Sequence, residues 1–223
     1  MNTSSFLTVL KGKYKNRKIP IPKKIHGHNN VTPQKIKESI FQIIENQIDS
    51  YEDSIFIDLF AGSGQMGIEA ASRGFVHNYF FDISRDRIAQ IKQWSQQNIS
   101  SVYQNCTFDV KDGTREFLKI IKGSSYVNEF INSHPSLKDV IVFADPPYGL
   151  NYKHKLLIDL LMVSFNQKQI ENSTFLITLI IQTNKDDLID SKHKDLKKYD
   201  DPNDEENFKN LYKYGRHRII VIT

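Results

Sequence analysis

The chain has 223 residues, of which 39% are hydrophobic and 25% charged, and its formal net charge is +4 at pH 7. This length suits one α/β domain with a full core. The single cysteine, Cys106, excludes a disulfide framework and a zinc site built from cysteines. The histidines show no metal-ligand spacing, so we expect no metal. We also expect no membrane span and no signal peptide, and therefore a cytoplasmic protein.

Positive charge is concentrated at the N-terminal end. Residues 1–37 contain nine lysines and arginines, and the first acidic residue is Glu38. A stretch of one sign attracts phosphate and suggests a nucleic-acid footprint, although a solvated basic tail has the same composition. The interleaved Tyr14 and the apolar residues of 19–22 argue against pure disorder, because they give the segment something to pack.

Short apolar runs alternate with helical patterns along the chain, which predicts a doubly wound, mostly parallel α/β sheet. The predicted strands are 54–60, 78–83, 107–111, 140–145 and 175–182. The predicted helices are 32–47, with Thr32 as N-cap and Pro33 in the first turn, 65–72, 84–97, 113–121 and 152–165. Gly215 separates 207–214 from 216–223, which we expect to form a closing antiparallel strand pair. Residues 185–206 are expected to form a surface loop without chemistry.

A glycine-rich turn follows the first strand. The sequence Ala61-Gly62-Ser63-Gly64-Gln65-Met66-Gly67 places G-x-G-x-x-G between a strand and a helix. Such glycines allow a tight turn and let a nucleotide approach the backbone, and the helix N-terminus offers N–H groups to an anion. Close packing of a strand on a helix also uses glycine. In the cofactor interpretation, the contacts come from the end of the strand and from this turn: Asp58, Phe60, Ala61, Gly62 and Gly64.

Four successive parallel strands end at or near an aspartate: Asp58, Asp82, Asp112 and Asp145. Carboxyl ends of parallel strands share one edge, where ligands of open α/β sheets bind. Asp82 is placed to accept the ribose hydroxyls of an adenosine, although a strand-end or N-cap role before Ser84 is the ordinary explanation of a single aspartate there.

Two cofactor classes fit this edge. A nicotinamide dehydrogenase uses the same glycines and Asp82, with Arg85 and Arg87 for a 2′-phosphate. An S-adenosylmethionine-dependent methyltransferase needs further acidic groups, which Asp58 and Asp112 supply.

The fourth strand distinguishes these classes through the loop Asp145-Pro146-Pro147-Tyr148. Two prolines force the chain out of the sheet and make a stiff turn. An exocyclic base amine is a poor nucleophile, because its lone pair is delocalised into the ring. The Asp145 carboxylate and the Pro146 carbonyl can accept its N–H bonds and aim the lone pair at a methyl donor. Pro147 and Tyr148 then complete the base pocket, with Tyr148 stacking on a base that has left its helix.

The chain resembles the RsmD-type family of bacterial small-subunit ribosomal RNA guanine-N2 methyltransferases over nearly its whole length. The resemblance rests on the blocks Gly12-Lys13-Tyr14-Lys15-Asn16-Arg17-Lys18-Ile19-Pro20, Lys37-Glu38-Ser39-Ile40-Phe41, Asp58-Leu59-Phe60-Ala61-Gly62-Ser63-Gly64, Gly67-Ile68-Glu69-Ala70, Ser72-Arg73-Gly74, Asn98, the Asp145–Tyr148 loop and Tyr214-Gly215. The chain departs from the family where Asn30-Val31-Thr32 replaces Arg-Pro-Thr, and where Gln182 replaces a glutamate. Residues 122–137 lengthen the path to the fourth strand.

The resemblance implies a class I methyltransferase fold with a seven-stranded sheet, and S-adenosylmethionine as the methyl donor. It implies the N2 amine of a guanine in 16S rRNA as acceptor, at a guanine-966-type site. The partner is then 16S rRNA or the small ribosomal subunit during assembly, and we expect a monomer. Residues 1–31 are expected to form a basic RNA-facing extension with a β-hairpin, and 32–223 the methyltransferase domain. The expected RNA contacts of the hairpin are Lys13, Lys15, Arg17 and Lys18.

Three alternatives stay open. The loop chemistry also suits an adenine N6 or cytosine amine of DNA or another RNA. A non-catalytic RNA-binding protein that has kept the fold is a second possibility, although it would be expected to lose Asp145 or the glycines. The nicotinamide dehydrogenase is the third, and it has no use for the Asp145–Tyr148 loop.

Overall fold

The computed structural model describes residues 6–21, 31–146, 176–184 and 211–222. Its strands are β1 (Phe6–Thr8), β2 (Lys18–Pro20), β3 (Ser54–Asp58), β4 (His77–Asp82), β5 (Cys106–Val110), β6 (Asp139–Ala144), β7 (Leu176–Asn184), β8 (Leu211–Tyr214) and β9 (His217–Ile222). Its helices are α1 (Gln34–Glu45), α2 (Gln65–Arg73), α3 (Arg85–Asn98), α4 (Ser100–Tyr103), α5 (Gly113–Ile121) and α6 (Tyr126–Ser133).

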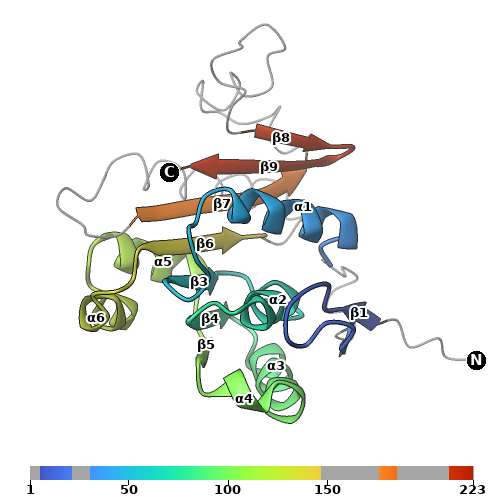
Figure 1. The fold of residues 1–223 in the computed structure, drawn as a ribbon, viewed down its shortest axis with the longest axis horizontal. Coiled ribbons are helices and arrows are strands. Elements are labelled where there is room, and N and C mark those ends of the chain that lie inside the picture. The colour runs from blue at the N-terminus through green and yellow to red at the C-terminus, as the bar shows by residue number, and fades with distance from the viewer. Residues whose placement is uncertain (1–5, 22–30, 147–175, 185–210, 223) are drawn as a thin grey trace, which may run out of the picture.

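Seven strands form one sheet in the order β5-β4-β3-β6-β7-β9-β8, which runs from the bottom to the top of Figure 1. The first five of these strands pair in parallel, whereas β9 pairs antiparallel with both β7 and β8. The predicted fold class is therefore confirmed: a mostly parallel, doubly wound sheet closed by an antiparallel pair. β1 and β2 form a separate two-stranded antiparallel hairpin.

The central strands are buried on both sides, because helices cover each face of the sheet. Every residue of β3 and β6 is buried, which explains their continuous apolar sequences. One face packs under α5 and α6, through Phe117 and Val127. The other packs under α1, α2 and α3, through Ile40, Met66 and Ile91. Residues 6–21, which contain β1 and β2 and are called the hairpin segment below, pack on this second face.

The predicted elements agree with the observed ones to within a few residues at their ends. The 122–137 insertion contains α6, which begins in a capping box formed by Ser125 and Asn128. Helix 152–165, loop 185–206 and residues 207–210 lie outside the described residues. Within the described part of the chain, no helix is long and apolar enough to cross a membrane. The same residues contain no cluster of three or more His, Cys, Asp or Glu side chains suited to a metal ion.

Candidate active site

The parallel strands bring the predicted aspartates to one edge of the sheet. Asp58 and Asp82 are the last residues of β3 and β4, and Asp145 directly follows β6. Asp112 lies two residues beyond β5. β3 lies between β4 and β6, so the strand order reverses direction there. In open α/β sheets, ligands bind at such a switch point, outside the carboxyl ends of the strands.

Asp58 is the most deeply buried acid of this edge, with 1% of its surface exposed. Burial and, to a smaller extent, the negative charge of Asp145 raise its pKa from 3.8 to about 8. Hydrogen bonds from the backbone N–H groups of Phe60 and Gly67 act in the opposite direction. Among the described residues, its Oδ1 atom has no hydrogen-bond partner. A buried, unpartnered carboxylate oxygen is costly, and it marks a place for a ligand donor.

Asp82 ties the glycine loop to α3. Its Oδ2 accepts the N–H of Gly62 at 2.9 Å, and its Oδ1 accepts the N–H of Ser84 at 2.8 Å. The guanidinium of Arg87 lies 3.6 Å from Oδ2. The N–H groups of Gly62 and Gly67 therefore donate to carboxylates of the protein itself. These N–H groups are then not free to bind the pyrophosphate of a nicotinamide dinucleotide. The arrangement therefore argues against the dehydrogenase interpretation.

The glycines of the loop have different roles. Gly62 has a φ of +54°, and a Cβ added there would contact only the Phe60 carbonyl, at 3.7 Å. A Cβ at Gly64 would lie 2.7 Å from Ile91, and one at Gly67 would lie 2.3 Å from Phe80. Gly64 and Gly67 are thus required for close packing inside the protein. Gly62 borders open space, as the residue nearest to a bound ligand should.

Asp112 and Ala61 stabilise this edge through the backbone. Asp112 is the N-cap of α5, and its Oδ1 accepts the N–H of Arg115 at 3.1 Å. A Cβ at Gly113 would lie 1.9 Å from the Leu59 carbonyl, so the turn after β5 packs directly on the loop after β3. Ala61 is buried, and its N–H donates to the Phe81 carbonyl at 2.8 Å. These contacts hold the two turns together beneath the site.

Asp145 receives a hydrogen bond from the segment before α1. The Thr32 hydroxyl donates to Asp145 Oδ2 at 3.1 Å, and Thr32 is only 3% exposed. The prediction that Thr32 caps the helix is wrong, because Pro33 occupies the N-cap position and no side chain caps α1. Pro146 is buried after Asp145. Pro147 and Tyr148 lie outside the described residues.

The hairpin segment packs apolar side chains inward and exposes its charges. Val9, Tyr14 and Ile19 are buried against α2 and α3. The four predicted RNA contacts are all exposed: Lys13, Lys15, Arg17 and Lys18. The Lys13 ammonium donates to Ser101 and that of Lys18 to Thr8, at 2.9 and 3.0 Å. In the part of the chain that the structure describes, no side-chain hydrogen bond or ion pair engages Lys15 or Arg17.

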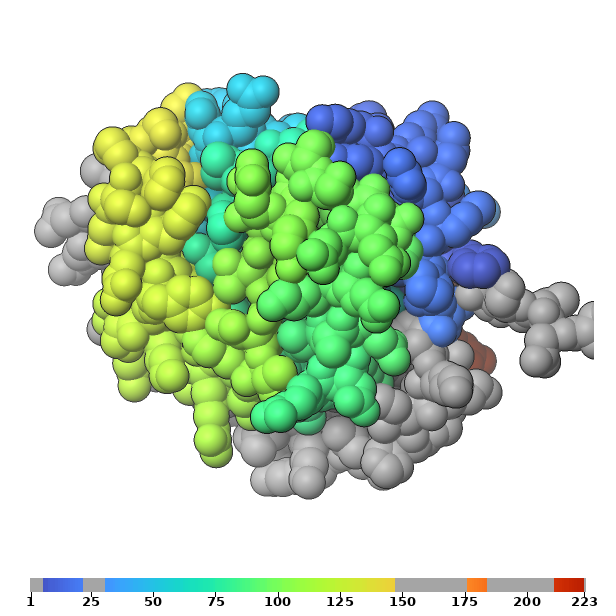
Figure 2. Space-filling model, turned by 90° about the horizontal axis from the view of Figure 1, so that it is seen from below, coloured from blue at the N-terminus to red at the C-terminus, as the bar shows by residue number. Residues whose placement is uncertain are grey.

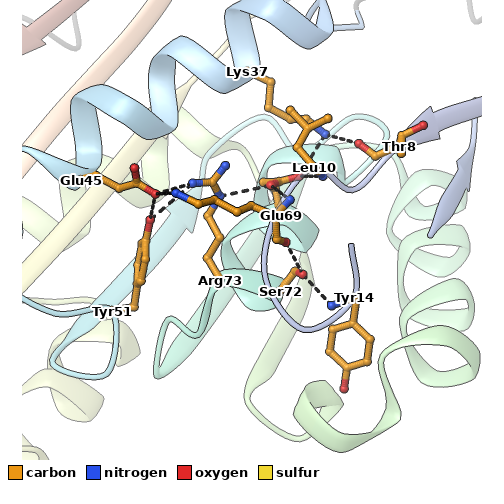
Figure 3. Close-up of polar contacts among 10 residues, drawn as sticks. Thr8, Leu10, Tyr14, Lys37, Glu45, Tyr51, Glu69, Ser72 and Arg73 are labelled. Carbon is orange, nitrogen blue, oxygen red and sulfur yellow. Dashed lines mark hydrogen bonds and ion pairs between the residues drawn. The ribbon is translucent and has the colours of Figure 1, made fainter. Parts of the chain in front are cut away.

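A buried ionic cluster fixes this segment to the domain (Figure 3). The Glu69 side chain is fully buried and accepts the backbone N–H groups of Leu10 and Lys11, at 2.7 and 2.9 Å. It also pairs with Lys37 at 3.2 Å and with Arg73 at 3.1 Å. Lys37, Glu69 and Arg73 lie in the sequence blocks that carry the family resemblance, but their mutual contact is non-local and could not be predicted from the pattern.

Further contacts strengthen the attachment. The Lys37 ammonium donates to the Thr8 carbonyl at 2.7 Å, and burial lowers the pKa of Lys37 against the opposing effect of Glu69. The Ser72 hydroxyl donates to the Lys11 carbonyl at 2.7 Å. A Cβ at Gly12 would lie 1.9 Å from the Ser72 carbonyl, so only glycine allows this approach. The hairpin segment is therefore fixed on α2 as a folded part of the molecule.

The sheet order, the glycine loop and the aspartate edge together define a class I methyltransferase domain. The chain belongs to the family described as conserved hypothetical protein 95, whose model matches residues 7–213, and the resemblance to RsmD-type methyltransferases is confirmed.

Known relatives and structures agree with this assignment. YlbH of Bacillus subtilis (strain 168), provisionally named an rRNA methyltransferase, is 48% identical over 61 residues, covering 27% of this chain and 32% of YlbH. Ribosomal RNA small subunit methyltransferase D of Buchnera aphidicola subsp. Baizongia pistaciae is 29% identical over 144 residues, covering 64% of this chain and 61% of the relative. The matched region thus spans about a third of YlbH and about three fifths of the Buchnera methyltransferase. The structure of Escherichia coli yhhF, provisionally named a methyltransferase, superposes with a TM-score of 0.58 at 17% identity, covering 97% of both chains.

Proposed function

We propose that this protein transfers a methyl group from S-adenosylmethionine to the exocyclic N2 amine of a guanine in 16S rRNA. The observation that carries this proposal is the position of Asp145 and Pro146 at the switch point of the sheet, beside the buried Asp58 and the glycine loop. The names of the curated relatives support ribosomal RNA as the substrate class. By this proposal the protein acts in the cytoplasm, as a monomer, on 16S rRNA or an assembling small subunit.

The acidic edge suits S-adenosylmethionine, which carries an ammonium and a sulfonium but no phosphate. Asp58 has an unpartnered Oδ1 among the described residues, and Gly62 borders open space. Asp82 keeps lone pairs for the ribose hydroxyls beyond its two backbone bonds. Phe60, Ala61 and Gly64 build the loop, and Asp112, the N-cap of α5, is proposed to lie on the adenine side. When bound, the cofactor supplies an electrophilic methyl group.

The chain's part of the reaction is to orient a weak nucleophile. The Asp145 carboxylate and the Pro146 carbonyl accept the two N–H bonds of the amine and direct its lone pair outward. The Thr32 hydroxyl fixes the carboxylate by donating to Oδ2. A carboxylate that accepts an N–H bond is also placed to take the proton that the amine gives up on methylation. Pro147 and Tyr148 are proposed to hold the base by stacking.

The test is methyl transfer from labelled S-adenosylmethionine to small-subunit RNA, with the modified nucleotide mapped by mass spectrometry. We expect N2-methylguanine, and Asp145→Ala should reduce turnover by about 100-fold or more. Calorimetry should show that this variant still binds S-adenosylhomocysteine. Methylation of adenine in DNA or another RNA would replace the proposed substrate by the alternative one. Unchanged turnover of Asp145→Ala would refute the assigned role of this carboxylate.

A further inference from the structure

A groove of about 430 Å³ begins at the glycine loop and continues between β2 and α3. Gly62 and Ser63 line its inner end, and Gln97 lines its far end along α3. Ten residues of helix separate Arg87 from Gln97, a rise of about 15 Å. Figure 2 shows the hairpin segment beside α3 and α4 on this side of the molecule. The groove therefore extends well beyond the glycine loop.

The walls of the groove combine one aromatic ring with several neutral amides. Trp94 is half-buried in the wall, and its indole N–H donates to the Lys18 carbonyl at 3.0 Å, which fixes the ring beside β2. Gln90, Gln93 and Gln97 contribute amide groups that can both donate and accept hydrogen bonds. None of the described residues that line the groove is a carboxylate. Aromatic faces and amides of this kind bind nucleobases without requiring one sequence.

Positive charge lies on both walls of the groove or next to them. Lys15 and Arg17 are exposed on the hairpin, a few residues before the part of β2 that lines the groove, and Arg87, which pairs with Asp82 at 3.6 Å, lines it from α3. The cationic groups of S-adenosylmethionine need carboxylates, which the strand edge provides and the described lining of this groove does not. Single-stranded nucleic acid needs cations for its backbone and flat surfaces for its bases, and both are present here.

We propose that this groove binds unpaired nucleotides that flank the target base, with one base stacked on Trp94. At about 3.4 Å for each stacked nucleotide, its length accommodates two or more. The glycine loop at its inner end makes it continuous with the methyl-transfer site. The inference rests on the proposed function, and it adds a second RNA site that places the strand on the side of α3.

Trp94 is the only tryptophan of the chain, so its fluorescence reports directly on the groove. Titration of the full chain with a short single-stranded oligouridylate should quench this fluorescence saturably. The quenching should persist when the protein is first saturated with S-adenosylhomocysteine. Absence of quenching would overturn the proposal, because the groove would then not bind RNA. Loss of quenching on saturation with S-adenosylhomocysteine would also overturn it, because the groove would then be part of the cofactor site.

Two substitutions on α3 give a matched test. Gln93→Glu places a carboxylate in the groove, whereas Gln96→Glu places one at an exposed position of the same helix that does not line it. We expect Gln93→Glu to weaken oligouridylate binding about tenfold and Gln96→Glu to leave it within about twofold. Trp94→Ala removes the fluorescent group, so its binding is measured by filter binding of labelled oligouridylate, and it should be about tenfold weaker or more because the stacked base loses its aromatic partner.

The outcomes separate this inference from the proposed function. Equal RNA affinity of the Gln93→Glu and Gln96→Glu variants, together with normal methylation of rRNA, would overturn the groove and leave the function standing. Quenching and a selective Gln93→Glu defect, without methylation of any RNA, would support the groove and overturn the proposed function. Thermal unfolding of each variant verifies that the fold is retained.

Discussion

At the scale of single residues, what the site can bind depends on which of its polar groups already hydrogen-bond to other groups of the protein. A motif search treats the glycines of G-x-G-x-x-G alike, yet only Gly62 borders open space, while Gly64 and Gly67 pack against side chains. The N–H groups expected to bind an anion are engaged by Asp58 and Asp82. The residue types of the site were therefore predictable from the sequence. Their individual roles were not, because these depend on contacts between separate strands.

Asp58→Asn should change how stability depends on pH. The folded-state pKa of Asp58 is raised to about 8, so the native state binds a proton that the unfolded chain releases above about pH 4. This contribution to stability is fully present below that value and is lost as pH rises toward 8. The difference in free energy of unfolding, wild type minus variant, should therefore decrease between about pH 4 and pH 8. Denaturant titrations at several pH values measure it, and parallel profiles would contradict the raised pKa.

Thr32→Val should impair turnover while leaving the cofactor in place. The substitution preserves shape but removes the hydroxyl that donates to Asp145 Oδ2. Loss of one positioning hydrogen bond should lower kcat about tenfold, because the carboxylate is less well fixed. Steady-state kinetics with rRNA and calorimetry with S-adenosylhomocysteine separate the two effects. Thr32→Ser, which keeps the hydroxyl, should restore kcat, and failure of this rescue would assign Thr32 a packing role only.

At the scale of elements, local pattern predicted the core helices and strands but not how they meet. The strands β3 and β6 are apolar throughout, and α5 begins and ends where its N-cap and apolar periodicity indicate. The helices α4 and α6 were missed, because α4 has only 4 residues and α6 only 8, and the capping box of α6 uses Asn128 rather than glutamate or glutamine. The attachment of the hairpin was also missed, since Glu69 contacts backbone about 58 residues away in the chain.

Glu69→Gln should release the hairpin segment from α2. The buried Glu69 compensates two cations, Lys37 and Arg73, which would be left with less opposing charge. Breaking a buried ion pair from one side costs about 3–5 kcal/mol. Denaturation should report a loss of this size, and hydrogen exchange should accelerate at the amides of Leu10 and Lys11, which donate to Glu69.

Lys11→Ala provides the control for this substitution. It removes the exposed ion pair with Glu45 but keeps the backbone N–H that donates to Glu69. An exposed pair contributes about 1 kcal/mol or less, so this variant should be nearly as stable as the wild type and equally protected. If Glu69→Gln and Lys11→Ala lower the free energy of unfolding equally, the buried cluster does not anchor the hairpin segment.

At the scale of the whole molecule, the two faces of the sheet have separate roles. α5 and α6 cover one face with an apolar core and no part of the candidate site except the cap at Asp112. The other face carries α2 and α3, the hairpin and the groove that starts at the glycine loop. The net charge of +4 says little by itself. Positive charge is concentrated on the hairpin, whose Lys13, Lys15, Arg17 and Lys18 are exposed, and this is where the proposed RNA substrate would be attracted.

Double substitution of Lys15→Gln and Arg17→Gln should therefore weaken RNA binding and lower its dependence on salt. Both side chains are exposed on the hairpin, and removal of two phosphate contacts should reduce the slope of log Kd against log salt concentration by about 1.4 for a single strand. The matched control is Lys119→Gln with Lys122→Gln, which removes the same charge from exposed positions on α5 and its C-cap. Filter binding at several salt concentrations measures both slopes. If the two double variants change the slope equally, RNA responds to the net charge of the protein rather than to the hairpin.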